Sequence, residues 1–284
     1  MRLGAHMSVK GGKHMALVRG KKIGCETVQI FIRNVRSWTS KPLEKAEIDD
    51  FLKKKNEIDD VWPIISHNSY LINLASQDDE KLGKSYDAML DEMTIADQLQ
   101  LDYVNMHPGV IPKSNQDLSS KEAMNQIVEY LNKLIDASKD SKLVILLETT
   151  AGQGKGLGHK FEHMNYMIER IKDKNRIGVC FDTAHSFAAG YDFRTKKKYE
   201  ALWNEFDEII GIRYLKAFHL NDTQKECGSR VDRHAHIGKG QIGEEAFSLL
   251  VNDESFKDLP GILETPEGDE MYEKNLRFLK SLRK

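Results

Sequence analysis

Histidine and carboxylate side chains end a series of short apolar segments in this sequence. The six segment ends are His67, His107, Glu148, Asp182, His219 and Glu264. Three further candidates stand nearby in the chain: His185 in "DTAHSF", and Asp232 and His234 in "GSRVDRHAH". Buried carboxylates that lie together repel one another and lose hydration, so such a cluster calls for a compensating cation. Imidazole nitrogen with carboxylate oxygen, and no thiolate, favours zinc and leaves manganese or iron as competitors.

These nine candidate ligands are too many for one ion. An open zinc site takes three protein ligands, so nine side chains would hold three ions, or slightly more if a carboxylate bridges. Ions about 3.5–4 Å apart are a standard arrangement for phosphodiester chemistry, because one activates water while others neutralise the phosphoryl and leaving oxygens. The pattern therefore predicts a multinuclear metal site for a phosphodiester substrate.

Simpler roles remain open for some of these positions. A lone histidine is more often a hydrogen-bonded structural residue than a metal ligand. This is the expected role of the other histidines: His6, His14, His159, His163 and His236. Asp182 by itself could be the N-cap of a following helix. Six segments end on an imidazole or a carboxylate, and one metal site explains this more simply than six separate structural roles do.

Strand-like and helix-like segments alternate along the chain. The expected strands are residues 3–7, 27–32, 63–67, 103–107, 143–148, 177–182, 214–220 and 261–264. Amphipathic segments between them include residues 43–56, 79–100, 119–138 and 270–282, with apolar residues every three to four positions. Eight such units predict an α/β fold, a single (β/α)8 TIM barrel domain over residues 1–284, with its site at the carboxyl ends of the strands.

Alternation along each strand sends every second side chain inward. The inward pairs would be Ile65 with His67, Asn105 with His107, Leu146 with Glu148, Cys180 with Asp182, Ala217 with His219 and Ile262 with Glu264. The barrel mouth would then carry a ring of imidazoles and carboxylates. Two connections, residues 183–198 and 221–243, are unusually long and are expected to be functional loops.

The overall charge provides no general attraction for nucleic acid, since 42 Lys and Arg are offset by 44 Asp and Glu. A phosphate backbone would have to meet a local basic patch. Candidate loop residues for it are Arg33, Arg36, Lys155, Arg194, Lys196, Lys197, Lys198, Lys225, Arg230, Arg233 and Lys239. The three lysines at 196–198 could equally serve loop solubility. Three cysteines without a CxxC pair, and no apolar run of about 18 residues, indicate a reducing, cytoplasmic setting.

Longer motifs carry a family resemblance over residues 4–282. They are "SHNSYLINL", "MHPG", "ETTAGQG", "GVCFDTAHSFAAGYD", "HLNDTQKECGSRVDRHAHIGKGQIG" and "ILETP". They closely resemble the endonuclease IV family of apurinic/apyrimidinic (AP) endonucleases, which are (β/α)8 barrels with a trinuclear zinc site. The resemblance implies one ion on His67, His107 and Glu148, a second on Glu148, Asp182, His219 and Glu264, and a third on His185, Asp232 and His234.

The resemblance also implies contacts with DNA. Arg36, Tyr70 and Leu71 match the side chains that the family inserts into the duplex at the lesion, although Tyr70 and Leu71 could instead be core residues under the loop. Arg230 and Arg233, in the second long loop, are expected to meet phosphates. Turning out an abasic nucleotide costs little because no base pair has to be broken.

The implied function is hydrolysis of the phosphodiester 5′ to an abasic site in duplex DNA, leaving a 3′-hydroxyl and a 5′-deoxyribose phosphate, together with removal of 3′-blocking groups. Glu148 is the expected catalytic residue, positioning a metal-activated water. Three Zn²⁺ ions, with Mn²⁺ in part, would serve a monomer acting at the nucleoid, with no nucleotide cofactor or membrane partner. Two alternatives remain: a metal-dependent sugar isomerase or epimerase of the same barrel type, and a non-catalytic protein that binds damaged DNA through structural metals.

Overall fold

A closed parallel barrel forms the centre of the computed structural model, which describes residues 1–115 and 117–284. Its strands neighbour one another in the order β1-β10-β7-β6-β5-β4-β3-β2, so the last barrel strand pairs with the first. They are β1 (Arg2–His6), β2 (Thr27–Ile30), β3 (Ile64–His67), β4 (Tyr103–Met106), β5 (Val144–Glu148), β6 (Ile177–Asp182), β7 (Leu215–His219) and β10 (Pro260–Leu263). The predicted (β/α)8 barrel is confirmed.

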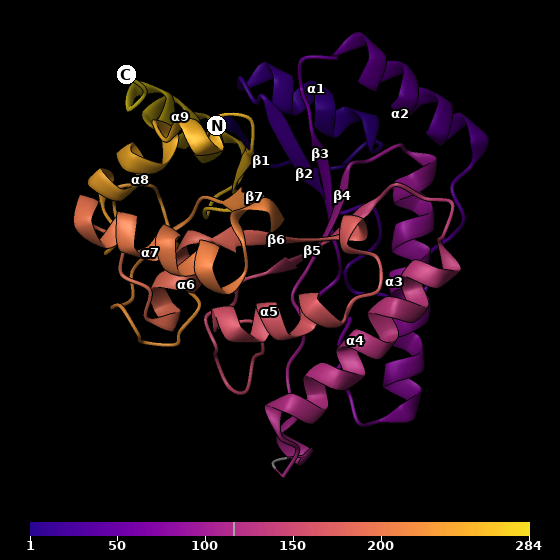
Figure 1. Ribbon diagram of the computed structural model, residues 1–284. Coiled ribbons are helices and arrows are strands. Elements are labelled where there is room, and N and C mark those ends of the chain that lie inside the picture. The colour runs from indigo at the N-terminus through magenta and orange to yellow at the C-terminus, as the bar shows by residue number, and fades with distance from the viewer. Residues whose placement is uncertain (116) are drawn as a thin grey trace.

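Helices surround the barrel on the outside (Figure 1). They are α1 (His14–Lys22), α2 (Lys45–Glu57), α3 (Asp79–Gln98), α4 (Ser120–Ala137), α5 (Phe161–Arg170), α6 (Thr183–Ala189), α7 (Lys196–Ile209), α8 (Glu244–Val251) and α9 (Asp269–Ser281). The two termini lie together, where the Arg283 guanidinium donates to the Met1 carbonyl at 2.7 Å (Figure 1). None of the helices in the described part of the chain has the length and apolar content needed to cross a membrane.

Helix α4 illustrates how local sequence starts these helices. Ser119 Oγ accepts from the backbone N–H of Glu122, whose carboxylate accepts in return from the Ser119 N–H at 2.9 Å. This reciprocal capping satisfies two amides that would otherwise lack partners. Further along, Ile127 and Leu131 are fully buried against the sheet. Capping and the apolar face thus fix where the helix begins and which side it turns to the barrel.

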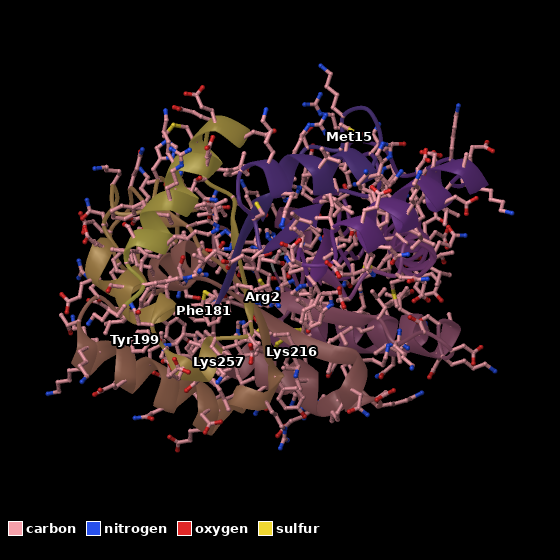
Figure 2. The ribbon with its side chains drawn as sticks, turned by 90° about the horizontal axis from the view of Figure 1, so that it is seen from above. Arg2, Met15, Phe181, Tyr199, Lys216 and Lys257 are labelled. Carbon is pink, nitrogen blue, oxygen red and sulfur yellow. The ribbon has the colours of Figure 1, made fainter. Side chains whose placement is uncertain are left out.

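Two separate apolar layers hold the barrel together. The inner layer consists of five fully buried side chains: Ile65, Leu146, Cys180, Ala217 and Ile262. These are inward residues predicted from strand alternation, each two positions before a candidate ligand. The outer layer lies between strands and helices. On the side that α7 covers, the centroid of the Trp203 ring is 4.9 Å from that of Phe181 and 6.0 Å from that of Tyr199. Phe181 and Tyr199 are labelled in Figure 2.

The two connections expected to be long loops differ from each other. Residues 183–198 are largely helical, because α6 follows β6 directly and α7 begins at Lys196. The prediction of a long loop was therefore wrong there, and Lys196–Lys198 form the first turn of a helix. Residues 221–243 do form an extended connection, stiffened by the short antiparallel pair β8 (Asp222–Thr223) and β9 (His234–Ala235).

Candidate metal centre

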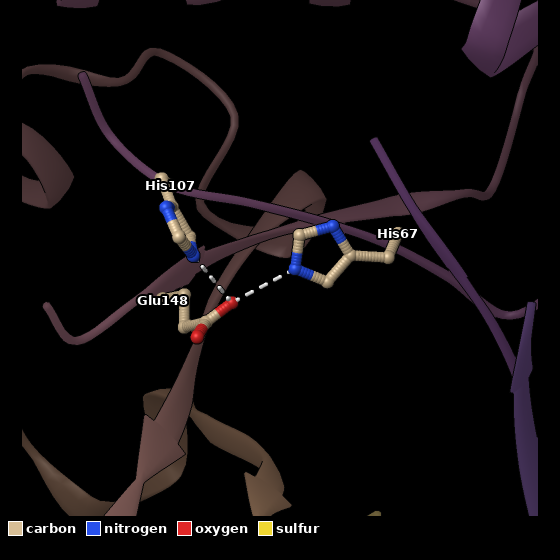
Figure 3. A group of neighbouring side chains, drawn as sticks. All are labelled: His67, His107 and Glu148. Atoms are coloured by element: carbon tan, nitrogen blue, oxygen red, sulfur yellow. Dashed lines mark hydrogen bonds and ion pairs between the residues drawn. The ribbon is translucent and has the colours of Figure 1, made fainter. Parts of the chain in front are cut away.

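The carboxylate of Glu148, at the end of β5, lies at the centre of the site. Its Oε2 is 3.2 Å from His67 Nε2 and 3.4 Å from His107 Nε2 (Figure 3). Its Oε1 is 3.1 Å from His185 Nδ1 and 3.2 Å from His219 Nδ1. One fully buried carboxylate therefore faces four imidazoles from separate parts of the chain. Such an oxygen pair can serve two cations at once, as a bridging ligand does.

The side chains assemble into three groups able to hold an ion, with ligand atoms within 4.8 Å of one another. The groups are His67, His107 and Glu148; then Glu148, Asp182, His219 and Glu264; and finally Asp182, His185 and His234. Asp232, the remaining predicted ligand, lies beside the third group, with its two oxygens 3.3 Å from His185 Nε2 and 3.3 Å from His234 Nε2. All nine predicted ligands thus lie together at the carboxyl ends of the strands.

Asp182 illustrates that a capping role and a site role are compatible. Its Oδ1 accepts from the backbone N–H of His185 at 2.7 Å, which makes it the N-cap of α6. Its Oδ2 accepts from the Asn221 amide at 2.8 Å and lies 3.7 Å from His219 Nδ1. The cap holds the carboxylate in place, so one oxygen stays oriented toward the candidate ligands.

Backbone carbonyls orient several of the imidazoles. Nδ1 of His67 is 2.8 Å from the Asn68 carbonyl, and Nδ1 of His234 is 3.2 Å from the Glu264 carbonyl. A carbonyl only accepts, so each Nδ1 must carry a proton, and in the neutral ring each Nε2 presents its lone pair. That Nε2 atom faces the carboxylates of the site in both rings. Metal-binding histidines are commonly held in this way by the hydrogen bond of their other nitrogen.

The charge distribution of the cluster suits a cation. Burial raises the pKa of Glu148, but His219 and His107 outweigh it and hold that pKa well below its usual range. Burial likewise raises the pKa of Asp232, while a hydrogen bond with His185 lowers it to about 2. For His185, burial lowers the pKa and Asp182 raises it, with a net value well above the ordinary one. The carboxylates of Glu148 and Asp232 are therefore ionised at neutral pH and available as ligands.

Three atoms of the site test whether metal fits it. Among the described residues, Glu148 Oε1, His219 Nδ1 and His234 Nε2 are buried with no hydrogen-bond partner. Unpartnered buried polar atoms are costly, and here all three belong to ligand types that zinc prefers. The donor set is nitrogen and oxygen without sulfur, as predicted. The residues present therefore fit a group of zinc-like ions.

Four polar residues at the site were missed as site residues by sequence reasoning. Asn105 donates to Glu148 Oε2 at 2.5 Å, and Asn221 donates to Asp182. Gln29 contacts both His219 and Glu264, and His6 Nδ1 lies 3.3 Å from Glu264 Oε1. The signal was available in part, because Gln29 and Asn105 are polar at inward positions of apolar strands. The other histidines assigned structural roles, His14, His159, His163 and His236, lie outside the three groups.

A cavity of about 190 Å³ adjoins the metal-ligand groups and is lined by His67, His107, His185 and Asp232, among others. Hydrogen bonds tie its loop walls together. Asn73 donates to the Val110 carbonyl at 2.8 Å, which joins the loops after β3 and β4. Gln153 accepts from the Asp232 N–H at 3.1 Å, which joins the loop after β5 to the long connection. The cavity walls are therefore preformed.

Of the predicted DNA-contacting side chains, Tyr70 lies at this cavity and the others lie on loops. Tyr70 lines it and is 69% exposed, so Tyr70 is not a core residue, while Leu71 is half-buried. Arg36 is exposed on a neighbouring loop, which Ser69 holds through a 2.7 Å hydrogen bond to the Val35 carbonyl. Arg230 and Arg233 are exposed on the long connection.

Three expected members of the basic patch are engaged elsewhere. Arg33 is buried and donates to the carbonyls of Ala88 at 2.7 Å and Trp38 at 2.9 Å, so it does not form part of a surface rim. Arg194 and Lys198 both pair with Asp192, at 2.8 Å and 2.6 Å. Their charges are offset locally, because the acid lies two and six residues away in the sequence. The patch is therefore smaller than the sequence suggested.

Comparison with known proteins agrees with this architecture. Residues 17–282 match the family described as xylose isomerase-like TIM barrel. A probable endonuclease 4 of Chloroflexus aggregans is 44% identical over 283 residues, 99% of this chain and 97% of that protein. An apurinic-apyrimidinic endonuclease of Caenorhabditis elegans is 42% identical over 94% of this chain and 66% of that protein.

Among solved structures, endonuclease IV from Thermus thermophilus superposes with a TM-score of 0.87 at 32% identity. The match covers 99% of this chain and 98% of that one. The sequence match and the structural match both extend over nearly the whole length, including the segments that carry the candidate ligands. The chain belongs to the endonuclease IV family of xylose isomerase-like TIM barrels.

Proposed function

We propose that this endonuclease hydrolyses the phosphodiester on the 5′ side of an abasic site in duplex DNA, with three zinc ions. The products would be a 3′-hydroxyl and a 5′-deoxyribose phosphate. The observation that carries the proposal is the position of Glu148, whose two oxygens face four imidazoles beside a small preformed cavity. Residues 1–284 would act as one catalytic unit.

The ligands of the three ions would follow the predicted division. His67 and His107 with Glu148 would hold one ion, Asp182, His219 and Glu264 with Glu148 a second, and His185, Asp232 and His234 a third. When bound, zinc lowers the pKa of water toward about 7 and neutralises charge that develops on a phosphoryl group. Manganese can use the same nitrogen and oxygen donors, so it could replace zinc in part.

The size of the cavity favours a substrate without a base. Pockets for drug-sized ligands usually measure about 300–1,000 Å³, whereas this one measures about 190 Å³. A sugar carrying no base fits such a space more readily than a complete nucleotide does. Because an abasic nucleotide has neither stacking nor pairing to lose, it also leaves the duplex at the lowest cost. The small cavity and the low energetic cost of turning the nucleotide out of the duplex therefore both favour an abasic site as the substrate.

The chain's own groups would then perform three tasks. Glu148 would hold the attacking water in line with the scissile bond, since its carboxylate is fixed by Asn105 and shared among the imidazoles. Tyr70, which is exposed at the cavity, would enter the duplex together with Leu71. Arg36 would enter the duplex with them, while Arg230 and Arg233 would contact phosphates and set the position of the backbone. Removal of 3′-blocking groups would use the same attack geometry on a shorter leaving fragment.

The test is strand cleavage of an end-labelled duplex with one stable abasic analogue, using zinc-loaded protein. We expect one cut on the 5′ side of the analogue and none in an undamaged duplex, with the protein monomeric in solution. Tight binding without cleavage would identify a damage-binding protein instead. Turnover of keto sugars without cleavage would identify an isomerase or epimerase. We place the activity at the nucleoid, where such DNA lies.

A further inference from the structure

A glutamine in the wall of the barrel contacts two candidate ligands that come from distant parts of the chain. Gln29 on β2 is fully buried. Its Oε1 lies 2.8 Å from Nε2 of His219, which is 190 residues away, and its Nε2 donates to Glu264 Oε1 at 2.6 Å. We propose that Gln29 is a positioning residue that presents His219 Nδ1 and Glu264 to the same ion. The proposal rests on the metal-dependent function proposed above.

The surroundings of Gln29 determine which way its amide faces. Glu264 Oε1 accepts one amide hydrogen, and His6 Nδ1 lies 3.0 Å away to accept the other. The reverse orientation would bring the amide oxygen to the position 2.6 Å from the Glu264 carboxylate, where two acceptors would face each other. The β-sheet register supports this arrangement, because His6 on β1 and Gln29 on β2 are paired neighbours.

The amide orientation in turn fixes the imidazole of His219. An amide oxygen only accepts, so Nε2 of His219 must carry a proton and donate it to Gln29. In the neutral imidazole, which is the form that binds a metal ion, Nδ1 is then the nitrogen that presents a lone pair. Nδ1 has no hydrogen-bond partner among the described residues and lies 3.2 Å from both Glu148 Oε1 and Glu264 Oε2. Gln29 therefore links Glu264 to His219 through a single amide group.

Among the described residues no backbone carbonyl orients the ring of His219, in contrast to the rings of His67 and His234. Among the described contacts, the Gln29 amide takes the place of that carbonyl. Loss of an outer hydrogen bond to a metal-binding histidine typically lowers metal affinity about 10–100-fold. The effect should be confined to the ion shared by His219 and Glu264, since Gln29 contacts none of the ligands of the other two groups.

The experiment measures zinc retention in the absence of DNA. Gln29→Met keeps the length of the side chain and removes the amide, and Thr27→Val serves as the matched control. Thr27 is buried on the same strand, and within the described part of the chain its hydroxyl donates only to the Pro63 carbonyl, so the control loses one buried hydrogen bond without touching a ligand. Zinc per chain is determined by elemental analysis across a series of chelator concentrations.

We expect Gln29→Met to release one of its three ions at a chelator concentration about 10–100-fold lower than wild type requires, while the other two leave as in wild type. Thr27→Val should follow the wild-type profile. In a His219→Ala background, Gln29→Met should add little, because both changes act on the same ion. Gln29→Leu provides a second apolar variant if Gln29→Met does not fold.

Retention of all three ions by Gln29→Met at wild-type chelator concentrations would overturn the proposal, and so would simultaneous loss of all three. Additive effects in the His219→Ala background would also contradict it. Cleavage of abasic DNA by wild type is measured in parallel. If wild type does not cleave but Gln29→Met still loses one ion early, the proposed function fails while the role of Gln29 stands.

Discussion

Glu92 on α3 is a buried acid outside the metal centre, and replacing it tests how burial controls charge in this fold. Its side chain is fully buried; Ser66 donates to Oε1, and Oε2 has no partner among the described residues. Burial raises its pKa from the ordinary 4.5 to about 7, against the opposing effects of Ser66 and Arg33. Glu92→Gln replaces the carboxyl group with a neutral group of the same shape.

The sign of the effect follows from proton binding. Between pH 4.5 and 7 the folded protein keeps the Glu92 proton that the unfolded chain has lost, so wild-type stability falls as pH rises and levels off above pH 7. The two pKa values imply a cost of about 1 kcal/mol at pH 5.5 and about 3 kcal/mol at pH 8.5. Glu92→Gln avoids this cost. Its stability advantage over wild type should therefore grow by about 2 kcal/mol between the two pH values.

Thermal unfolding of the zinc-loaded proteins measures this difference. In domains of comparable size, 1 kcal/mol shifts Tm by about 2–4 °C, so the advantage of Glu92→Gln should be at least about 4 °C larger at pH 8.5 than at pH 5.5. Asp87→Asn, an exposed change on the same helix, should show no such dependence. An advantage of Glu92→Gln that is equal at both pH values, or absent at pH 8.5, would refute the reasoning.

Three further variants test the proposed mechanism. Glu148→Gln should lose about a thousandfold or more in turnover and keep its affinity for abasic duplex, because it removes a shared ligand and leaves the DNA-facing loops intact; cleavage at the wild-type rate would remove Glu148 from the mechanism. Asp232→Ala should bind less zinc and cut abasic DNA about 10–100-fold more slowly, since it contacts both His185 and His234; a sugar isomerase activity that survives this change would favour the alternative function. Tyr70→Ala should raise KM for abasic duplex about tenfold with little change in kcat, because it removes one exposed stacking side chain. A decrease in kcat alone would instead indicate that Tyr70 takes part in the catalytic step.

Much of the fold and of the candidate site could be predicted because the relevant signals are local. A β-strand has a period of two, so a histidine or carboxylate at a strand end and an apolar residue two positions earlier share one face of the sheet. Ile65 with His67 and Leu146 with Glu148 follow that rule, and the apolar members form the inner layer. Ser119 and Glu122 likewise specify the start of α4 from four consecutive residues. In such cases backbone geometry over a few residues decides the outcome.

Tertiary structure alone decided the contacts between distant segments. Nothing near Gln29 in the sequence indicates that it contacts His219 or Glu264, because that contact depends on the closure of the barrel through β1 and β10. Arg33 was expected on the surface, but packing of its loop against α3 buries it. The sequence by itself determined which strand side chains face inward and where a helix such as α4 begins, since both depend on short-range geometry. The register of the closed barrel decided which of those side chains meet and in which orientation. It brings Gln29 and His219, 190 positions apart in the sequence, to within hydrogen-bond distance.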